Sequence, residues 1–209
     1  MIKYVPELTS VVLEEIPDRV TLAVEISNCR GNCPGCHSPF LKEDIGEELT
    51  PEVIDALVAD NFGVDCFLFL GEGRDPEALC ALAAHVRSKG LFAAVYSGRP
   101  EVDDSIWASF DYVKVGPYVE ALGPLNKPTT NQRLYRALRP EDADSAVAIK
   151  PGLSQSAVSP EVYPAAAPSK LPSAAAAPEV SLHYFAGRPF QDITARFWHR
   201  GLEARRSSG

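Results

Sequence analysis

Hydrophobic positions in the first 116 residues follow two spacings that alternate along the chain. Some runs are continuously apolar or alternate with smaller residues, as strands of a buried sheet do. Four strands are therefore predicted, at residues 19–27, 64–71, 91–98 and 111–116. Other runs carry apolar residues three and four positions apart, which is helical spacing. Helices are predicted from these runs at residues 50–62 and 75–90, and a shorter one at 101–110.

Two of the predicted helices carry clear start signals. Thr50 precedes Pro51, and Asp75 precedes Pro76, so each helix has a side-chain acceptor at the N-cap and a proline at its first position. Gly90 follows the second helix as a stop signal. The pattern therefore predicts where both helices begin.

The order of these elements predicts an α/β fold. Strands that alternate with helices through short crossovers are typical of parallel βαβ units. Such sheets carry their chemistry at the carboxyl ends of the strands. Each predicted strand is followed by a distinctive loop: a cysteine-rich segment after residue 27, "GEGRDP" after 70, "SGRP" after 96 and "GPY" after 115.

The composition changes in the last third of the chain. Residues 151–180 are rich in Pro, Ala and Ser and have few periodic apolar residues, which predicts a low-complexity linker or insertion. We expect a main domain at 1–150 and a C-terminal segment at 181–209 that packs back on it. Within that segment a strand is predicted at 181–187, followed by a helix with Asp192 as its cap.

Composition and charge narrow the function classes. The 209 residues are 45% apolar, enough for one main domain with a real core. No apolar run approaches the roughly 20 residues that cross a bilayer, and no leader pattern is present, so a cytoplasmic protein without a membrane partner is expected. The formal net charge of −8 argues against a nucleic-acid partner.

Three of the five cysteines lie in "NCRGNCPGCHSP", residues 28–39. An odd number of clustered thiols disfavours a disulfide framework and favours a reducing compartment and metal binding. Cys29, Cys33 and Cys36 can hold three corners of a four-iron cube, leaving the fourth iron open to a non-protein ligand. Cys66 and Cys80 lie in apolar stretches and are expected to be core residues.

Two other uses of the three thiols stay open at this point. His37 follows Cys36 directly, so a zinc site with three cysteines and one histidine can be drawn, although adjacent residues rarely fit one tetrahedron. Cys33 and Cys36 also have the spacing of a redox pair, which would leave Cys29 without a role.

The cysteine spacing at the end of the first strand resembles the signature of radical S-adenosylmethionine enzymes. "NCRGNCPGCHSP" is similar in particular to the activating proteins of anaerobic ribonucleoside-triphosphate reductases. Further similar segments are "YSGRP" at 96–100, "VKVGPYVEALGPLNKPTTNQRLYR" at 113–136 and "DITARFW" at 192–198. The resemblance covers about residues 1–138 and the last 20 or so; the insert at 151–180 has no counterpart in it.

This resemblance implies a partial (β/α) barrel of the radical S-adenosylmethionine type, laterally open toward a protein substrate. Its implied cofactors are a [4Fe-4S] cluster and S-adenosyl-L-methionine, which is cleaved by one electron to methionine and a 5′-deoxyadenosyl radical. The radical removes a hydrogen atom from a glycine of the reductase. The implied partners are the anaerobic ribonucleoside-triphosphate reductase and a reducing electron-donor protein. No side-chain acid or base is expected, because the cofactors carry the chemistry.

The resemblance also implies roles for individual residues. Cys29, Cys33 and Cys36 would be the cluster ligands, and Gly35 and His37 would flank the adenosyl part of the cofactor. Gly71, Glu72 and Gly73 stand where the family has a Gly-Gly-acid motif that holds the methionine amino group. The order of these residues departs from the motif, so either Glu72 or Asp75 could be the acid.

Other strand-end residues are weaker candidates. Ser97 and Gly98 are candidates for the methionine carboxylate. Lys114 could be solvated or could meet a cofactor carboxylate. Residues 131–133, Asn-Gln-Arg, could line the open side or cap a following helix.

The main hypothesis is therefore an enzyme that forms a glycyl radical in an anaerobic ribonucleotide reductase. Within the enzyme class, the alternatives are activation of another glycyl radical enzyme and radical chemistry on a small molecule. From another class, the alternative is a non-catalytic interaction module that binds zinc or an iron–sulfur cluster. A binding module would not need the distinctive loops at the strand ends.

Overall fold

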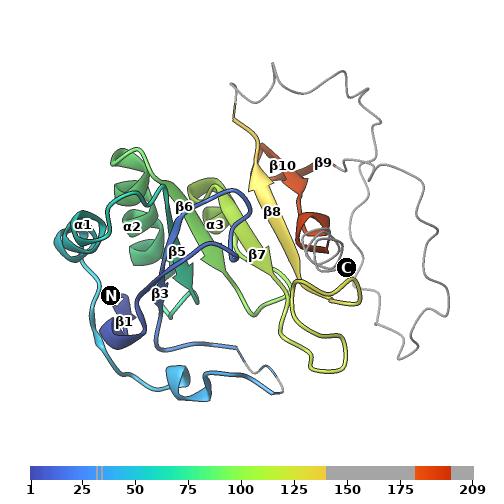
Figure 1. Cartoon of the computed structure of the whole chain (residues 1–209), viewed down its shortest axis with the longest axis horizontal. Helices are drawn as coiled ribbons and strands as arrows, with labels where there is room; N and C mark the ends of the chain where they lie inside the picture. Colours follow the sequence, from blue (N-terminus) through green and yellow to red (C-terminus); the bar gives the residue numbers. More distant parts are fainter. Residues whose placement is uncertain (32, 34, 140–181, 199–209) are drawn as a thin grey trace, which may run out of the picture. The chain divides into compact units, whose positions relative to one another are not determined.

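The computed structural model describes residues 1–31, 33, 35–139 and 182–198. Their central element is a mixed eight-stranded sheet with the strand order β2-β3-β5-β6-β7-β8-β10-β9 (Figure 1). The strands are, in that order, β2 (Ser10–Val12), β3 (Thr21–Glu25), β5 (Cys66–Leu70), β6 (Phe92–Tyr96), β7 (Tyr112–Val115), β8 (Arg133–Ala137), β10 (Arg188–Asp192) and β9 (Leu182–Phe185). A separate two-stranded ribbon pairs β1 (Lys3–Tyr4) with β4 (Glu47–Glu48).

The middle of the sheet is built from parallel βαβ units, as predicted. β3, β5, β6 and β7 pair in parallel, and α1 (Pro51–Asp60), α2 (Pro76–Ser88) and α3 (Asp104–Ser109) connect them. Thr50 and Asp75 cap their helices by accepting hydrogen bonds from backbone N–H groups three residues on. The α/β fold class and all seven elements predicted before residue 117 are confirmed.

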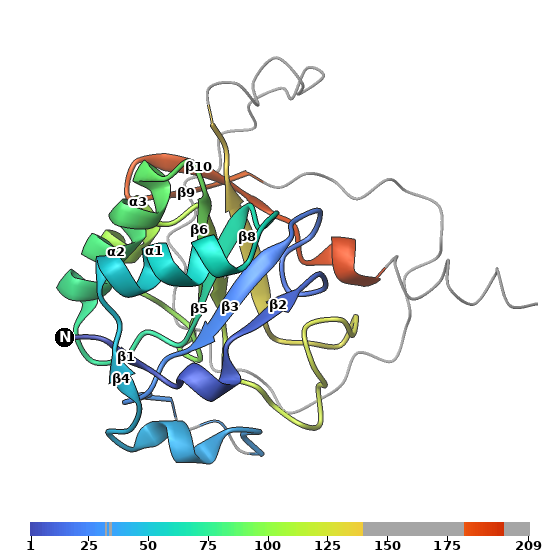
Figure 2. The same cartoon turned by 60° about the vertical axis from the view of Figure 1, so that its left-hand side comes forward.

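The two faces of the sheet bury different residues because side chains alternate along each strand. On one face, apolar residues such as Phe67, Phe69 and Val113 pack with the buried sides of the three helices, which lie together in Figure 2. On the other face, here called the inner face, Leu68 and Tyr112 pack under loop and C-terminal residues. The inner cluster includes Ile16, Leu125, Leu134 and Ile193.

Antiparallel strands extend the sheet beyond β7. β8 pairs with β7, β10 pairs with β8, and β9 pairs with β10. The helix considered after residues 131–133 is wrong, because Arg133 begins β8 and its segment forms a ladder on each side. The strand predicted at 181–187 is confirmed as β9, but β10 between it and the expected helix was not predicted.

The C-terminal described residues return to the sheet. Asp192 ends β10, and its carboxylate accepts a hydrogen bond from Thr194 N at 2.9 Å before residues 195–198 turn into a helix. β9 and β10 belong to the same compact unit as residues 1–138. The predicted insertion at 151–180, the end of the segment given as 1–150 and the last eleven residues lie outside the described residues.

Apart from the β1–β4 ribbon, the described strands form an eight-stranded mixed sheet whose edge strands are β2 and β9. No closed barrel is present among them. In the part of the chain that the structure describes, no helix has both the length and the apolar character needed to span a bilayer.

Candidate functional site

The cysteine loop leaves the sheet at the carboxyl end of β3. Asn28 has a positive φ of 60°, a conformation that asparagine tolerates better than most residues, and it turns the chain away from the strand. The next residue is anchored, because Cys29 N donates to Leu41 O at 2.9 Å. Cys36 N donates to Cys33 O at 3.2 Å, so the end of the loop folds back on itself.

Two of the three loop thiols lie on either side of Gly31. Gly31 N donates to Cys29 Sγ at 3.3 Å. A Cβ on Gly31 would lie 3.3 Å from Cys29 Sγ and 3.7 Å from Cys33 Sγ, so a side chain there would enter the space between the thiols. The described residues contain no group of three or more His, Cys, Asp or Glu side chains already arranged to hold a metal ion.

Of the other two cysteines, Cys66 is a core residue, as predicted, whereas Cys80 is partly buried and packs against the core. Cys66 lies in β5 on the inner face and is fully buried, and burial raises the pKa of its thiol to about 12. Cys80 lies on α2, packs against the helix-side core, and directs its sulfur toward Ser105 O at 3.5 Å. Neither thiol belongs to the cysteine loop.

The loop after β7 approaches the cysteine loop from the side. The rings of His37 and Tyr118 meet edge to face, with their centroids 5.1 Å apart. Gly35 has a φ of 76°, and a Cβ there would lie 3.6 Å from Glu120 Oε2. In Figures 1 and 2 the segments after β3 and after β7 lie at the same end of the sheet.

A hydrogen-bonded network joins the ends of β5 and β6. The Glu72 carboxylate accepts from Arg99 Nη2 at 2.6 Å and from Arg99 Nε at 3.1 Å, and it also accepts a hydrogen bond from the Ser97 hydroxyl. Ser97 Oγ in turn accepts from Arg99 N at 2.9 Å. Asp103 contacts the exposed side of Arg99 at 3.2 Å. Two predicted site residues, Glu72 and Ser97, are therefore in direct contact.

The alternative acid, Asp75, has a different role. Its carboxylate caps α2 through Ala78 N at 3.0 Å and forms an ion pair with the amino group of Met1, and both contacts hold the pKa of the carboxyl below its usual value. Of the two acids, Glu72 lies with the strand-end network and Asp75 lies at the helix start.

The glycines around Glu72 allow the ends of β5 and β3 to approach closely. Gly71 and Gly73 have φ values of 121° and 62°, which a residue with a side chain rarely adopts. A Cβ on Gly71 would lie 3.2 Å from Ile26 O, and one on Gly73 would lie 3.1 Å from Ile2 Cδ1. These contacts place the loop after β5 beside the base of the cysteine loop.

Lys114 is buried on the inner face, so the prediction that it might be solvated is wrong. Its ammonium group donates to Gly116 O at 3.0 Å and approaches Ser97 O at 3.5 Å. Burial lowers its pKa to about 8, and the nearby charges of Cys33 and Glu15 oppose that shift. The amino group thus lies beneath the edge of the sheet where the cysteine loop begins.

Polar groups next to Lys114 were missed by the sequence reasoning. By strand register, Glu25, Leu70, Tyr96 and Lys114 form one row across the parallel strands. The Tyr96 hydroxyl donates to the backbone oxygen of Glu15, and burial raises the pKa of both side chains. Tyr96 ends a predicted strand, but nothing in the sequence indicates that residue 15 returns to it.

The Asn-Gln-Arg segment stabilises the loop before β8. Asn131 Nδ2 donates to Pro117 O at 3.0 Å, and Arg133 donates to Thr130 O at 2.9 Å. Gln132 is 5% exposed. The hydrogen bond of Asn131 to Pro117 joins the two ends of the loop between β7 and β8.

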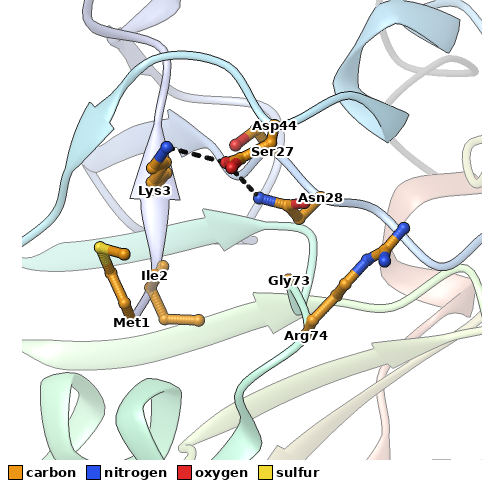
Figure 3. A pocket seen from close by; sticks show the side chains of 8 residues that line it. All are labelled: Met1, Ile2, Lys3, Ser27, Asn28, Asp44, Gly73 and Arg74. Carbon is orange, nitrogen blue, oxygen red and sulfur yellow. Dashed lines mark hydrogen bonds and ion pairs between the residues drawn. The ribbon is translucent and has the colours of Figure 1, made fainter.

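A small cavity of about 150 Å³ lies at the base of the cysteine loop (Figure 3). Asp44 in its wall accepts a hydrogen bond from Asn28 Nδ2 at 2.9 Å and pairs with Lys3 at 2.8 Å. The cavity lining is Met1, Ile2, Lys3, Ser27, Asn28, Asp44, Gly73 and Arg74. The residue before the first loop cysteine is therefore tied to β1 through a shared carboxylate.

Arg99 is the functional-site candidate that sequence reasoning passed over. The signal available was an arginine in one strand-end loop and a glutamate in the neighbouring strand-end loop, which meet when the strands are parallel and adjacent.

The chain was compared with models of protein families, with curated proteins and with solved structures, and it matches none of them.

Proposed function

We propose that the protein activates an anaerobic ribonucleoside-triphosphate reductase by forming a glycyl radical in it. The observation that carries this proposal is the position of a three-thiol loop at the carboxyl end of β3, beside the glycine-containing ends of β5 and β6. On this proposal the sheet is the partial barrel of a radical S-adenosylmethionine enzyme, with its inner face toward the cofactor.

The residues at this edge fit an iron–sulfur cluster with an open corner. Three thiols are the donor set such a cluster requires; of the remaining two cysteines, Cys66 is buried in the core and Cys80 packs against it. Gly31 and Gly98 leave space where a Cβ would lie 3.3 Å from Cys29 Sγ and from Cys33 Sγ, respectively.

Cys29, Cys33 and Cys36 would hold the [4Fe-4S] cluster. With S-adenosyl-L-methionine bound, the cluster supplies the single electron that cleaves this cofactor and so generates the radical for the reductase glycine. The protein's part is to bind and orient: Gly35 and His37 would border the adenosyl group, and Gly71, Glu72, Gly73 and Ser97 the methionine end. Lys114 provides a buried positive charge beneath this edge.

The proposal is tested by anaerobic reconstitution followed by incubation with the reductase, S-adenosyl-L-methionine and a reductant. We expect about four irons per chain, as a cube requires, and a glycyl radical signal by electron paramagnetic resonance. If a glycyl radical forms in a different enzyme but not in the reductase, the proposed substrate is wrong, and activation of another glycyl radical enzyme is favoured instead. Binding of zinc alone would contradict it and favour an interaction module.

A further inference from the structure

The segment 97–99 is held from both sides at the carboxyl end of β6. Toward β7, its backbone is tied by Ser97 N to Lys114 O at 2.8 Å and by Gly116 N to Arg99 O at 2.7 Å. Toward β5, the backbone of the preceding residue is tied by Gly71 N to Tyr96 O at 3.1 Å. Residues 97 and 99 themselves contact the β5 loop through side chains, by the paired contacts of Arg99 with Glu72 and by the Ser97 hydroxyl. Beyond Tyr96, the described contacts to the β5 loop are therefore those of Glu72 with its two donors.

Gly98, between these two residues, lies close to the cysteine loop. A Cβ on Gly98 would lie 3.3 Å from Cys33 Sγ and 4.0 Å from Gly31 Cα. The hydrogen bonds that fix residues 97 and 99 therefore also fix the position of Gly98 beside the Cys33 thiol. The hydrogen bond from Arg99 N to Ser97 Oγ closes this turn from inside, at 2.9 Å.

The geometry of the Arg99–Glu72 pair suits a positioning role. An arginine that contacts both oxygens of one carboxylate fixes direction as well as distance, which a single ammonium contact does not. The Glu72 side chain is 13% exposed and that of Arg99 is 30% exposed, so the pair is shielded on the glutamate side. Asp103, which is 57% exposed, contacts the same guanidinium from the solvent side.

We propose that Arg99 is a positioning residue that, through Glu72 and Ser97, holds Gly98 against Cys33 and so orients this thiol before any cofactor binds. Any effect of Arg99 on cluster assembly rests on the function proposed above. The effect of Arg99 on the Cys33 thiol rests only on the contacts of residues 72, 97, 98 and 99. The Glu72 carboxylate is committed to Arg99 and Ser97, so its first role is to organise the loops.

The test is the alkylation rate of each cysteine in the metal-free, reduced full-length protein, followed residue by residue with iodoacetamide and mass spectrometry. Arg99→Gln and Glu72→Gln each remove one half of the pair. We expect both to speed alkylation of Cys33 about tenfold, the factor that corresponds to a loss of about 1.4 kcal/mol in the opening equilibrium. Cys36, whose thiol is not among the atoms near Gly98, should change by less than about twofold on the same scale.

Three controls separate positioning from a general loss of structure. Asp103→Asn removes only the exposed contact of Arg99 and should leave the Cys33 rate unchanged. Arg196→Gln removes an exposed arginine from its ion pair with Asp18 and should do the same. Arg99→Lys keeps the charge without the paired contacts, so it should give a rate between those of wild type and Arg99→Gln.

Buried Cys66 reports whether each variant is folded, because it should stay unreactive in the native protein. Unchanged Cys33 rates in both Arg99→Gln and Glu72→Gln would overturn the proposal. Equal acceleration of all cysteines, Cys66 included, in these variants and in Arg99→Lys would also overturn it, because the pair would then only stabilise the fold. Since no metal or cofactor is present, these outcomes do not depend on whether the protein activates a reductase.

Discussion

The two faces of the parallel strands bury different chemistry although the same strands build both. The helix-side face encloses aromatic and aliphatic side chains, with Phe69 between the rings of Phe67 and Phe110. At the carboxyl end of the inner face, Lys114 and the partly buried Glu15 adjoin Tyr96. The helix-side face stabilises the fold through the hydrophobic effect, because its apolar side chains are removed from water.

Burying charged groups on the inner face costs stability unless partners compensate. Lys114 has such a partner in Gly116 O, and the Tyr96 hydroxyl donates to the backbone oxygen of Glu15. At the neighbouring strand ends, Glu72 and Arg99 compensate each other's charge. These groups lie at the carboxyl edge of the sheet, where the three-thiol loop begins. We therefore expect substitutions on the helix side to change stability, and those at the edge to change cysteine chemistry.

The largest effect is expected from Cys33→Ala. Losing one of three thiolates should abolish cluster assembly, so iron bound after reconstitution should fall from about four per chain to near zero. The helix-side thiol is the matched control, and Cys80→Ala should assemble a full cluster. Iron analysis and visible absorbance measure both. Full iron content in Cys33→Ala would remove Cys33 from the ligand set.

Phe69→Ala should lower the stability of the helix-side core without changing cluster assembly. Because the ring is fully buried in an aromatic cluster, its removal should lower the free energy of unfolding by about 3–5 kcal/mol. Urea unfolding measures this loss. If the helix-side core and the cysteine loop are independent, the folded variant should still bind a full complement of iron. Loss of iron without loss of stability would show that they are not independent.

A smaller effect is expected from the pH dependence of Cys66. Its pKa is about 12 in the folded protein and about 8.5 in an unfolded chain. Because the folded pKa is the higher one, the stability that this thiol contributes is present below about pH 8.5 and is lost as the pH rises toward 12. The slope is at most about 1.4 kcal/mol per pH unit.

Urea unfolding of wild type and Cys66→Ala, each at about pH 8 and pH 10, isolates this contribution. We expect wild type to lose more stability than the variant between the two values. Parallel pH profiles of the two proteins would mean that the thiol does not titrate differently on unfolding.

The smallest effect is expected from Thr50→Ala at the start of α1. The Thr50 hydroxyl accepts from Val53 N at 3.3 Å, and loss of an N-cap costs about 1 kcal/mol. The thermal midpoint should fall slightly, while the alkylation rates of the loop cysteines stay the same. Altered cysteine rates would show that α1 and the edge of the sheet are coupled.

The parallel core of the fold was predictable because each element carries its own local signal. Caps at Thr50 and Asp75 and buried strand runs are properties of contiguous residues, so they can be recognised without knowing the partner strands. β8 and β10 depend on antiparallel pairing between segments far apart in the sequence. Their residues, including Arg133, Arg188 and Pro189, are too polar or irregular to give a clear strand pattern alone.

The sequence indicated part of the candidate site, but it did not indicate Arg99, Tyr96 or Glu15, nor the connections between the site residues. The cysteine loop and the strand-end glycines follow from spacing and from the expected position of loops in a parallel sheet. That Glu72 pairs with Arg99, and that Lys114 is buried near Glu15, depends on side-chain directions that a linear pattern does not contain. Residues 71–73, in the order Gly-Glu-Gly, belong to this network through Glu72.

The most direct test of the central claim is 5′-deoxyadenosine formation by the anaerobically reconstituted full-length protein, given S-adenosyl-L-methionine and dithionite. If Cys29, Cys33 and Cys36 hold a cluster with an open corner, 5′-deoxyadenosine and methionine should form in equal amounts, and none should form with Cys33→Ala. A protein that assembles a four-iron cluster yet leaves S-adenosyl-L-methionine intact would contradict the account.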